Sequence, residues 1–223
     1  MEKELKELVE NNTLMWLPWV GTEYLDSEVK FLIVGESHYF NPEELHSFEK
    51  HQNKFFTREV IEEMPMNRDY YQTKVFQNFH RAMIGNDTFD AKKFWNQISF
   101  YNFIQKPMNT NKGRPTNEDY FENWNGFLKL VETIKPTICI FIGSSSANSF
   151  NSYFSKISID FTPVKNMDKI GANYAKSSSL KVNNIELPIH FIKHTSQYFS
   201  WQKWNEYLKK TIPSEIQFLE AIV

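Results

Sequence analysis

Residues 30–39, Lys-Phe-Leu-Ile-Val-Gly-Glu-Ser-His-Tyr, determine the fold of this chain more than any other stretch. The run 30–34 is almost continuously apolar, which is typical of a strand that is buried on both faces of a sheet. The sequence then changes abruptly to a glycine followed by polar side chains. A buried strand that ends in this way indicates an α/β sheet with a ligand site at its carboxyl edge.

Three later runs share this buried-strand character. Each is short, rich in β-branched or aromatic residues and almost continuously apolar, and they occupy residues 98–103, 137–142 and 189–193. The segments between the runs place apolar residues at helical spacing. Strands that alternate with helices at such distances need crossover connections, which favour a mainly parallel sheet.

The helical spacing is clearest in three segments. Helices are predicted at 60–84, 120–134 and 201–210. Pro65 implies a break in the first of them, because proline cannot donate a helical hydrogen bond. Thr116, with Asp119 three positions later, forms a variant of the capping box ahead of the second helix.

These patterns predict one α/β domain over residues 1–223. We expect a three-layer sandwich with a four-stranded, mainly parallel sheet and helices on both faces. A helical insertion is expected at about 41–97, because the first two strands lie far apart in the sequence. The serine run 177–179 is expected to be a loop.

The composition excludes several classes of protein. With 223 residues, 41% of them hydrophobic, and a net charge of −2, the chain is an ordinary globular one and is not disordered. No apolar run approaches the roughly 20 residues of a membrane-spanning helix. Cys139 is the only cysteine, so disulfide scaffolds and multi-thiolate metal sites are excluded, and no metal or organic cofactor is expected. The charged N-terminal segment 1–10 is not a signal peptide, so we expect a cytoplasmic protein.

Polar residues follow each of the four predicted strands. Ligands bind outside the carboxyl ends of the strands in an open α/β sheet, so these positions form the candidate site. They are Gly35-Glu36-Ser37-His38-Tyr39, Tyr101-Asn102 with Gln105-Lys106-Pro107, Gly143-Ser144-Ser145-Ser146, and His194-Thr195-Ser196.

One chemistry compatible with these ends is that of a serine-dependent hydrolase of the SGNH type, with Ser37 as the nucleophile. Such an enzyme needs an acid that orients its histidine, usually an aspartate three residues before it. Phe191 and Leu187 occupy that position relative to His194 and His190. The sequence therefore gives only weak support to a hydrolase of this type.

Cleavage of an N-glycosidic bond in a nucleic acid fits the strand ends better. The sugar becomes cationic and the base leaves with negative charge, so the site needs a donor for a base carbonyl, an amide for the base edge and a carboxylate near the sugar. His194, Asn102 and Glu36 would supply these groups in that order. The aromatic content of 16% fits stacking on a flipped base.

The motifs resemble those of the uracil-DNA glycosylase superfamily, most closely its family 4-type members. The stretch 35–39 is similar to a Gly-Glu-Ala-Pro-Gly motif, and 102–107 is similar to Asn-Val-Val-Lys followed by Arg-Pro. The downstream Arg114-Pro115-Thr116-Asn117-Glu118 fits the Pro-Thr-x-Glu motif of the family. The next family motif is a helix, a Lys-Pro, a strand and Gly-x-x-Ala, and it is matched by Lys135-Pro136 with Gly143 and Ala147. His194-Thr195-Ser196 matches the final His-Pro-Ser, so the resemblance covers most of the chain, from about Phe31 to Trp204.

The resemblance implies roles in catalysis and base binding. Asn102 would read the base edge, and His194 would stabilise the departing base anion. Glu36 and Ser37 occupy the positions of the water-activating and sugar-contacting residues. The residues implied in the base pocket are Gly35, His38, Tyr39, Tyr101 and a stacking phenylalanine, Phe55 or Phe56. Tyr39 would exclude a bulky C5 substituent.

The resemblance also implies a DNA-contacting surface. Gln197, Tyr198 and Phe199 would form the wedge that fills the space left by the flipped nucleotide. The remaining candidates for DNA contact are Lys106, Arg114, Ser144, Ser145, Thr195 and Ser196.

The departures from the family pattern are specific. Family 4-type enzymes hold an iron–sulfur cluster with four cysteines, and this chain has one cysteine, so no metal cluster is expected. His38 and Thr195 each replace a motif proline, and Ser37 replaces an aspartate of the best-known branch, which moves the water-activating role toward Glu36. The altered motif suggests a base other than plain uracil, such as a hypermodified pyrimidine of phage DNA.

The distribution of charge favours a DNA partner. Residues 1–70 carry 7 basic and 15 acidic side chains, whereas residues 71–210 carry 18 basic and 10 acidic ones and include three of the four site loops. An acidic N-terminal part can coexist with a local phosphate-attracting groove, so the near-zero net charge does not argue against DNA and predicts modest, salt-sensitive non-specific binding. We expect a monomeric, monofunctional DNA glycosylase active in base excision for DNA repair or phage defence. A binding module of the same fold without catalysis is the nearest alternative.

Overall fold

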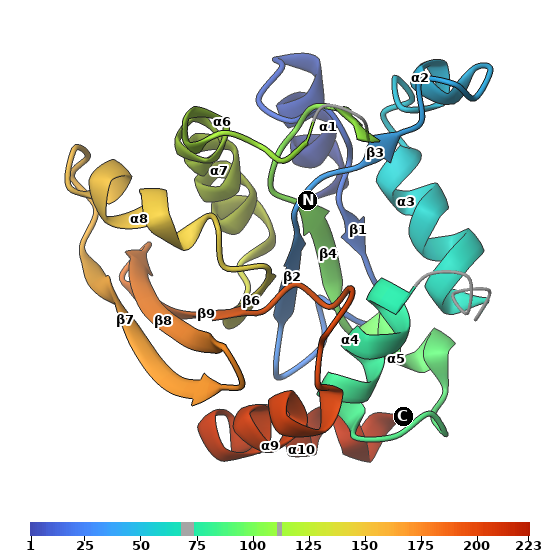
Figure 1. The fold of residues 1–223 in the computed structure, drawn as a ribbon. Helices are drawn as coiled ribbons and strands as arrows, with labels where there is room; N and C mark the ends of the chain where they lie inside the picture. The colour runs from blue at the N-terminus through green and yellow to red at the C-terminus, as the bar shows by residue number, and fades with distance from the viewer. Residues whose placement is uncertain (68–73, 111–112) are drawn as a thin grey trace.

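A computed structural model describes residues 1–67, 74–110 and 113–223. In these residues the central feature is a mixed sheet of seven strands with the order β1-β4-β2-β6-β9-β8-β7 (Figure 1). The prediction of an α/β fold is confirmed. The prediction of a four-stranded sheet is wrong, because further strands extend the sheet at both edges.

The four predicted strands form the centre of this sheet and run parallel to one another. They are, in spatial order, β4 (Ser99–Asn102), β2 (Phe31–Gly35), β6 (Ile138–Ile142) and β9 (Ile185–Ile192). Phe31 and Ile33 of β2 pack into the core on one face, and Leu32 and Val34 pack into the core on the other. Burial on both faces explains the continuous apolar run in the sequence.

The added strands are antiparallel. β1 (Trp19–Val20) pairs with β4 at one edge. At the other edge β8 (Asn173–Val182) pairs with β9, and β7 (Phe161–Ile170) pairs with β8. β7 is exposed along most of its length and has two irregularities of register in its pairing with β8. The serine run 177–179, expected as a loop, lies within β8.

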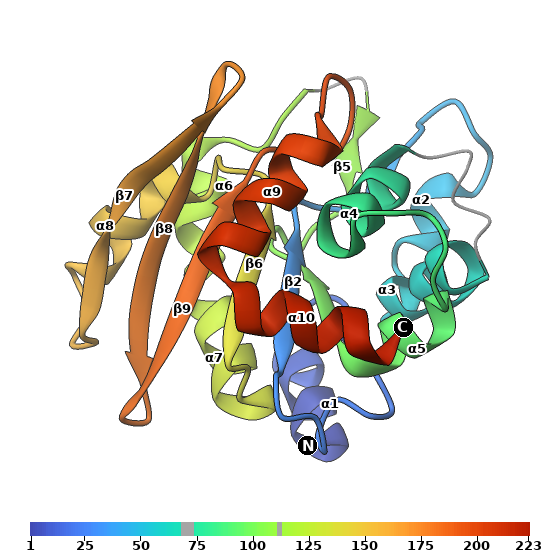
Figure 2. The ribbon, with the colours of Figure 1, turned by 90° about the horizontal axis from the view of Figure 1, so that it is seen from below.

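Helices cover both faces of the sheet (Figures 1 and 2). On one face lie α1 (Glu2–Glu10), α7 (Trp124–Ile134) and α8 (Ala147–Phe154). On the other face lie α4 (Lys74–Ile84), α5 (Ala91–Gln97), α9 (Trp201–Thr211) and α10 (Pro213–Ile222). Fully buried tryptophans anchor both layers, Trp124 in the first and Trp95 and Trp204 in the second.

Two predicted helices have close counterparts. The segment 120–134 forms two helices, α6 (Asn117–Glu122) and α7, which meet at Asn123. Thr116 and Asp119 make the capping box at the start of α6. The predicted helix 201–210 corresponds to α9.

The stretch between β3 (Tyr39–Phe40) and β4 is helical wherever it has regular structure in the described residues. It contains α2 (Ser47–Lys50), α3 (Phe56–Ile61), a π-helical segment (Glu62–Met66), α4 and α5. The predicted break at Pro65 falls in the π-helical segment, and residues 68–73 of the predicted helix 60–84 lie outside the described residues. β3 pairs with β5 (Met108–Asn109) and holds the loop after β2 against the loop after β4.

Candidate active site

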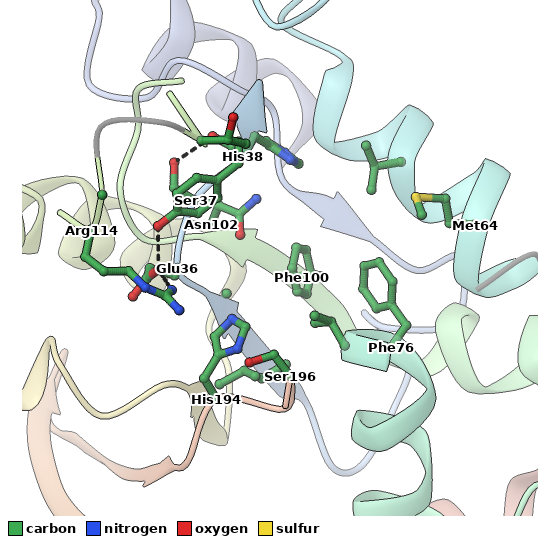
Figure 3. A pocket seen from close by; sticks show the side chains of 17 residues that line it. Glu36, Ser37, His38, Met64, Phe76, Phe100, Asn102, Arg114, His194 and Ser196 are labelled. Atoms are coloured by element: carbon green, nitrogen blue, oxygen red, sulfur yellow. Dashed lines mark hydrogen bonds and ion pairs between the residues drawn. The ribbon is translucent and has the colours of Figure 1, made fainter. Parts of the chain in front are cut away.

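One cavity of about 600 Å³ lies at the carboxyl ends of β2, β4 and β6 and the loop after β9. Its far wall comes from α3, the π-helical segment and α4. In Figure 3, Glu36, Asn102, Arg114 and His194 surround one side of the cavity, and Met64 and Phe76 form the other, with Phe100 between. The predicted site residues that line it are Gly35, Glu36, Ser37, His38, Tyr39, Asn102, Arg114, His194 and Ser196.

Asn102 is the strongest sign of a ligand site. Asn102 is only 4% exposed and lines the cavity. Its backbone carbonyl accepts a hydrogen bond from Gln105, but its side-chain amide has no hydrogen-bond partner among the described residues. The side-chain atoms of Asn102 are not among the fully buried polar atoms that lack a partner, so they are open to the cavity and to a polar group of a ligand. Asn102 is therefore positioned to bind a polar group in the cavity.

Gly35 makes room for this amide. β2 and β4 pair in parallel with Gly35 opposite Asn102. A Cβ atom at position 35 would collide with Oδ1 of Asn102 and with the ring of Phe100. The glycine is therefore required by a close approach of side chains, which agrees with its place in the predicted site.

We expect Gly35→Ala to destabilise the fold by about 1–3 kcal/mol, because the added methyl group overpacks the space between β2 and the Asn102 side chain. The free energy of unfolding from urea denaturation measures this cost. The matched control is the same change in an Asn102→Ala background, where the amide is gone and the cost should be smaller. Equal costs in the two backgrounds would show that the side chains do not interfere.

Glu36 is held by three donors from different parts of the chain. Its carboxylate accepts hydrogen bonds from the hydroxyls of Tyr39 and Tyr120 and from the guanidinium of Arg114, each at 2.7 Å. Burial raises the pKa of Glu36, but the hydrogen bonds from these three groups outweigh burial and hold the pKa below its ordinary value. The site therefore contains an ionised carboxylate that is held in an ion pair with Arg114.

His194 follows β9 and faces the cavity as a neutral imidazole. Burial lowers its pKa, the charge of Glu36 raises it and that of Arg114 lowers it, and the net effect is a lowered pKa. Its Nδ1 atom is buried and has no hydrogen-bond partner in the described part of the chain. A neutral imidazole offers one N–H donor and one acceptor. His194 can thus donate a hydrogen bond to a carbonyl group of a ligand.

Ser37 and His38 have structural partners. The Ser37 hydroxyl donates to the backbone carbonyls of Lys106 at 2.8 Å and Ile104 at 3.1 Å. The His38 ring is buried against Trp16, and its Nε2 lies 2.9 Å from Oγ1 of Thr57 in α3. Both side chains fasten the loop after β2 to its surroundings.

His38 makes the stability of the fold sensitive to acid. Burial, with a smaller effect of His51, lowers the pKa of His38 from 6.5 to about 3. Between these values the unfolded chain binds a proton that the folded chain does not, so the free energy of unfolding falls as the pH falls below about 6.5. Burial of His190, whose pKa is lowered to about 4, acts in the same direction.

We expect His38→Gln to reduce this pH dependence, because it removes one of the three histidines, His38, His190 and His194, whose pKa is lowered by burial. Urea denaturation between about pH 7.5 and 5 measures the slope. The control is His46→Asn, since His46 is exposed and its left-handed backbone suits asparagine. A slope unchanged by His38→Gln would contradict the assignment.

The loop after His194 is anchored from two sides. The Asn78 amide of α4 donates to the carbonyls of Thr195 at 2.8 Å and Ser196 at 3.2 Å. The Lys193 ammonium donates to the carbonyl of Tyr198 at 2.6 Å. Tyr198 has a left-handed backbone, with φ of 57°, and is 93% exposed. Its ring therefore projects from a fixed loop.

The structure places several predicted site residues elsewhere. Tyr101 is buried on the opposite face of β4, because neighbouring residues in a strand point to opposite faces. Phe56 packs against His38 and His51 and does not line the cavity. Phe55 is partly exposed at the start of α3. Phe199 is buried and stacks on Trp204, so it is a core residue and not part of a wedge.

The other candidates for DNA contact lie outside the cavity. Lys106 is half exposed and forms an ion pair with Asp119. Thr195 is buried and Gln197 exposed. Ser144 and Ser145 lie between β6 and α8, and Ser145 is exposed.

Several residues of the site were not anticipated. Tyr120 reaches Glu36 from 84 positions away, and Asn78 reaches Thr195 from 117 positions away. No local pattern marks either residue. Phe100 could have been found, since it is two positions before Asn102 and must share its face of the strand.

Among the described residues, no group of three His, Cys, Asp or Glu side chains is placed to hold a metal ion. None of the helices in the same residues has the length and apolar character needed to cross a membrane. The sequence matches no protein-family model, and no curated protein is similar to it.

Proposed function

We propose that this protein is a DNA glycosylase that hydrolyses the N-glycosidic bond of a flipped uracil or modified pyrimidine. The observation that carries the proposal is that one cavity brings together the amide of Asn102, the neutral His194, whose buried Nδ1 has no partner among the described residues, and the ionised Glu36. These are the groups that the chemistry needs, and they come from three separate strand ends. The resemblance of the motifs to the uracil-DNA glycosylase superfamily supports the same reading.

Each group has a definite role in the proposed reaction. The bond between the sugar C1′ and the base nitrogen breaks, and its electron pair leaves with the base. His194 donates a hydrogen bond to a base carbonyl where the charge develops, and Asn102 pairs with the adjacent edge. The Glu36 carboxylate stabilises the cationic sugar. Water then adds to C1′, and its released proton neutralises the base anion.

Two of the proposed DNA contacts line the cavity. The Arg114 side chain is 66% exposed and lies next to Glu36, and Ser196 lines the cavity. The exposed Tyr198 ring is the proposed wedge. Additional phosphate contacts are proposed for Lys106, Ser144, Ser145 and Gln197, whereas Thr195 is fully buried and is not proposed for this role. We further propose a cytoplasmic monomer that needs no metal or organic cofactor.

The direct test is a base-release assay. DNA oligonucleotides that carry one uracil or one modified cytosine are incubated with the protein, and abasic sites are then cleaved by alkali. We expect strand cleavage, with the free base detected by mass spectrometry. Retention of DNA in a gel without release of any base would contradict the proposal.

The second candidate is a nucleic-acid-binding module without catalysis. It is favoured by one observation: the Glu36 carboxylate already accepts three hydrogen bonds, so its capacity to activate water is reduced. The serine hydrolase has less support, because the Ser37 hydroxyl donates to backbone carbonyls and no histidine is bonded to it in the described residues.

A further inference from the structure

The cavity has two chemically different parts. Its polar part contains Glu36, Asn102, Arg114 and His194. The remaining wall is apolar, and Figure 3 shows Met64 and Phe76 of this wall across the cavity from the polar groups. We call this wall the apolar annex, and it comprises Val60, Met64, Val75, Phe76, Phe100 and Ile142.

The volume exceeds the need of a single pyrimidine ring. A cavity of about 600 Å³ lies within the range of roughly 300–1000 Å³ that receives drug-sized ligands. A pyrimidine held by Asn102 and His194 would leave much of the annex uncovered. Displacement of water from an apolar surface by an apolar group is favourable, so an apolar group on the base would increase its affinity for the cavity.

The annex combines fixed and adaptable walls. Phe76 and Phe100 are buried, lie 6.2 Å apart between ring centroids and both pack against Trp95, so their rings are held in place. Met64 belongs to the π-helical segment. Methionine adapts to ligands of different shape, and π-helical turns occur often at functional sites.

We infer that the annex binds an apolar extension of the excised base, so the preferred base is larger than an unmodified pyrimidine; this inference rests on the proposed glycosylase function. The base presents a C=O and an adjacent N–H to the Asn102 amide, which can donate to the first and accept from the second. Uracil with an apolar C5 substituent has this edge, and so does a 6-oxopurine such as hypoxanthine. The C5 substituent adds purely apolar bulk, whereas hypoxanthine adds a second ring whose N7 is a hydrogen-bond acceptor. The Tyr39 hydroxyl is bonded to Glu36 at 2.7 Å, and this inference replaces the expectation that Tyr39 excludes a bulky C5 substituent.

The test compares base release from oligonucleotides that carry uracil, 5-propynyluracil or hypoxanthine. We expect the wild-type chain to release at least one of the two larger bases faster than uracil. The faster of these two shows whether the cavity prefers a C5 substituent or a second ring. Val75→Phe fills the annex and should slow release of that larger base at least tenfold while uracil release stays within about twofold. Val60→Phe is a second filling variant for the case that the first does not fold.

The control is Ile185→Phe, which adds the same bulk at an exposed position at the opposite end of β9 from His194. Uracil released fastest, with rates that do not respond to filling of the annex, would overturn the inference and leave the proposed function standing. Equal slowing of all three bases would also overturn it. Release of no base at all would overturn the proposed function and this inference together.

Discussion

Replacement of His194 by alanine should slow base release about 100- to 1000-fold and leave the fold intact. The reason is that the reaction loses the donor aimed at the departing base, and removal of one such donor typically has an effect of this size. His194 lies on a loop, its Nδ1 has no partner among the described residues, and its side chain faces the cavity, so little packing is lost. Single-turnover measurement of base release gives the rate.

The control for this variant is His46→Ala, which removes an exposed histidine near α2. The pH profile provides a second criterion. Because the pKa of His194 is lowered, the imidazole is neutral at neutral pH, and its proposed role as an N–H donor predicts a rate that does not decline as the pH rises through about 6.5. A decline over that range would show that the charged imidazolium is required.

Replacement of Glu36 by glutamine should have the second largest effect. The amide group cannot accept all three hydrogen bonds from Tyr39, Tyr120 and Arg114, and its own N–H groups face donors. We expect base release to fall about 100-fold, because the charge that stabilises the cationic sugar is lost. We also expect the free energy of unfolding to fall by roughly 2 kcal/mol at neutral pH.

The pH dependence of stability checks the second effect. The pKa of Glu36 is lowered in the folded chain, so its contribution is present above about pH 4.5 and is lost as the pH falls through the folded value. The glutamine variant should lack this contribution. The control is Glu118→Gln, an exposed acidic residue in α6. A Glu36→Gln chain as stable as the control would contradict the role assigned to the three donors.

The central strands could be predicted because burial on both faces leaves a continuous apolar run, as in 31–34. β7 and β8 could not be recognised in the same way. Their sequences are rich in lysine and serine, since one or both faces are exposed, and the Ser177–Ser179 portion has the composition of a loop. A polar edge hairpin is stabilised by pairing with β9, which no local pattern reveals.

The candidate site likewise has one part that the sequence predicts and one part that depends on contacts between distant residues. Gly35, Glu36, Asn102 and His194 could be predicted, because the carboxyl ends of parallel strands meet at one edge of a sheet. The phenylalanine that stacks on the base was expected to be Phe55 or Phe56, whereas the phenylalanines that line the cavity are Phe76 and Phe100. That choice depends on how α3 and α4 pack against the sheet, and this packing depends on contacts between distant parts of the chain.

The hairpin edge has a consequence for association between copies of the chain. A free strand edge can serve as a template on which a further strand assembles. β7 interrupts this template in three ways: Pro163 offers no N–H group, two register irregularities bend the strand, and exposed Lys165 and Lys169 repel a like edge. Protection against aggregation therefore resides in strands that the cavity does not use. Substitutions that reshape the cavity leave that protection untouched.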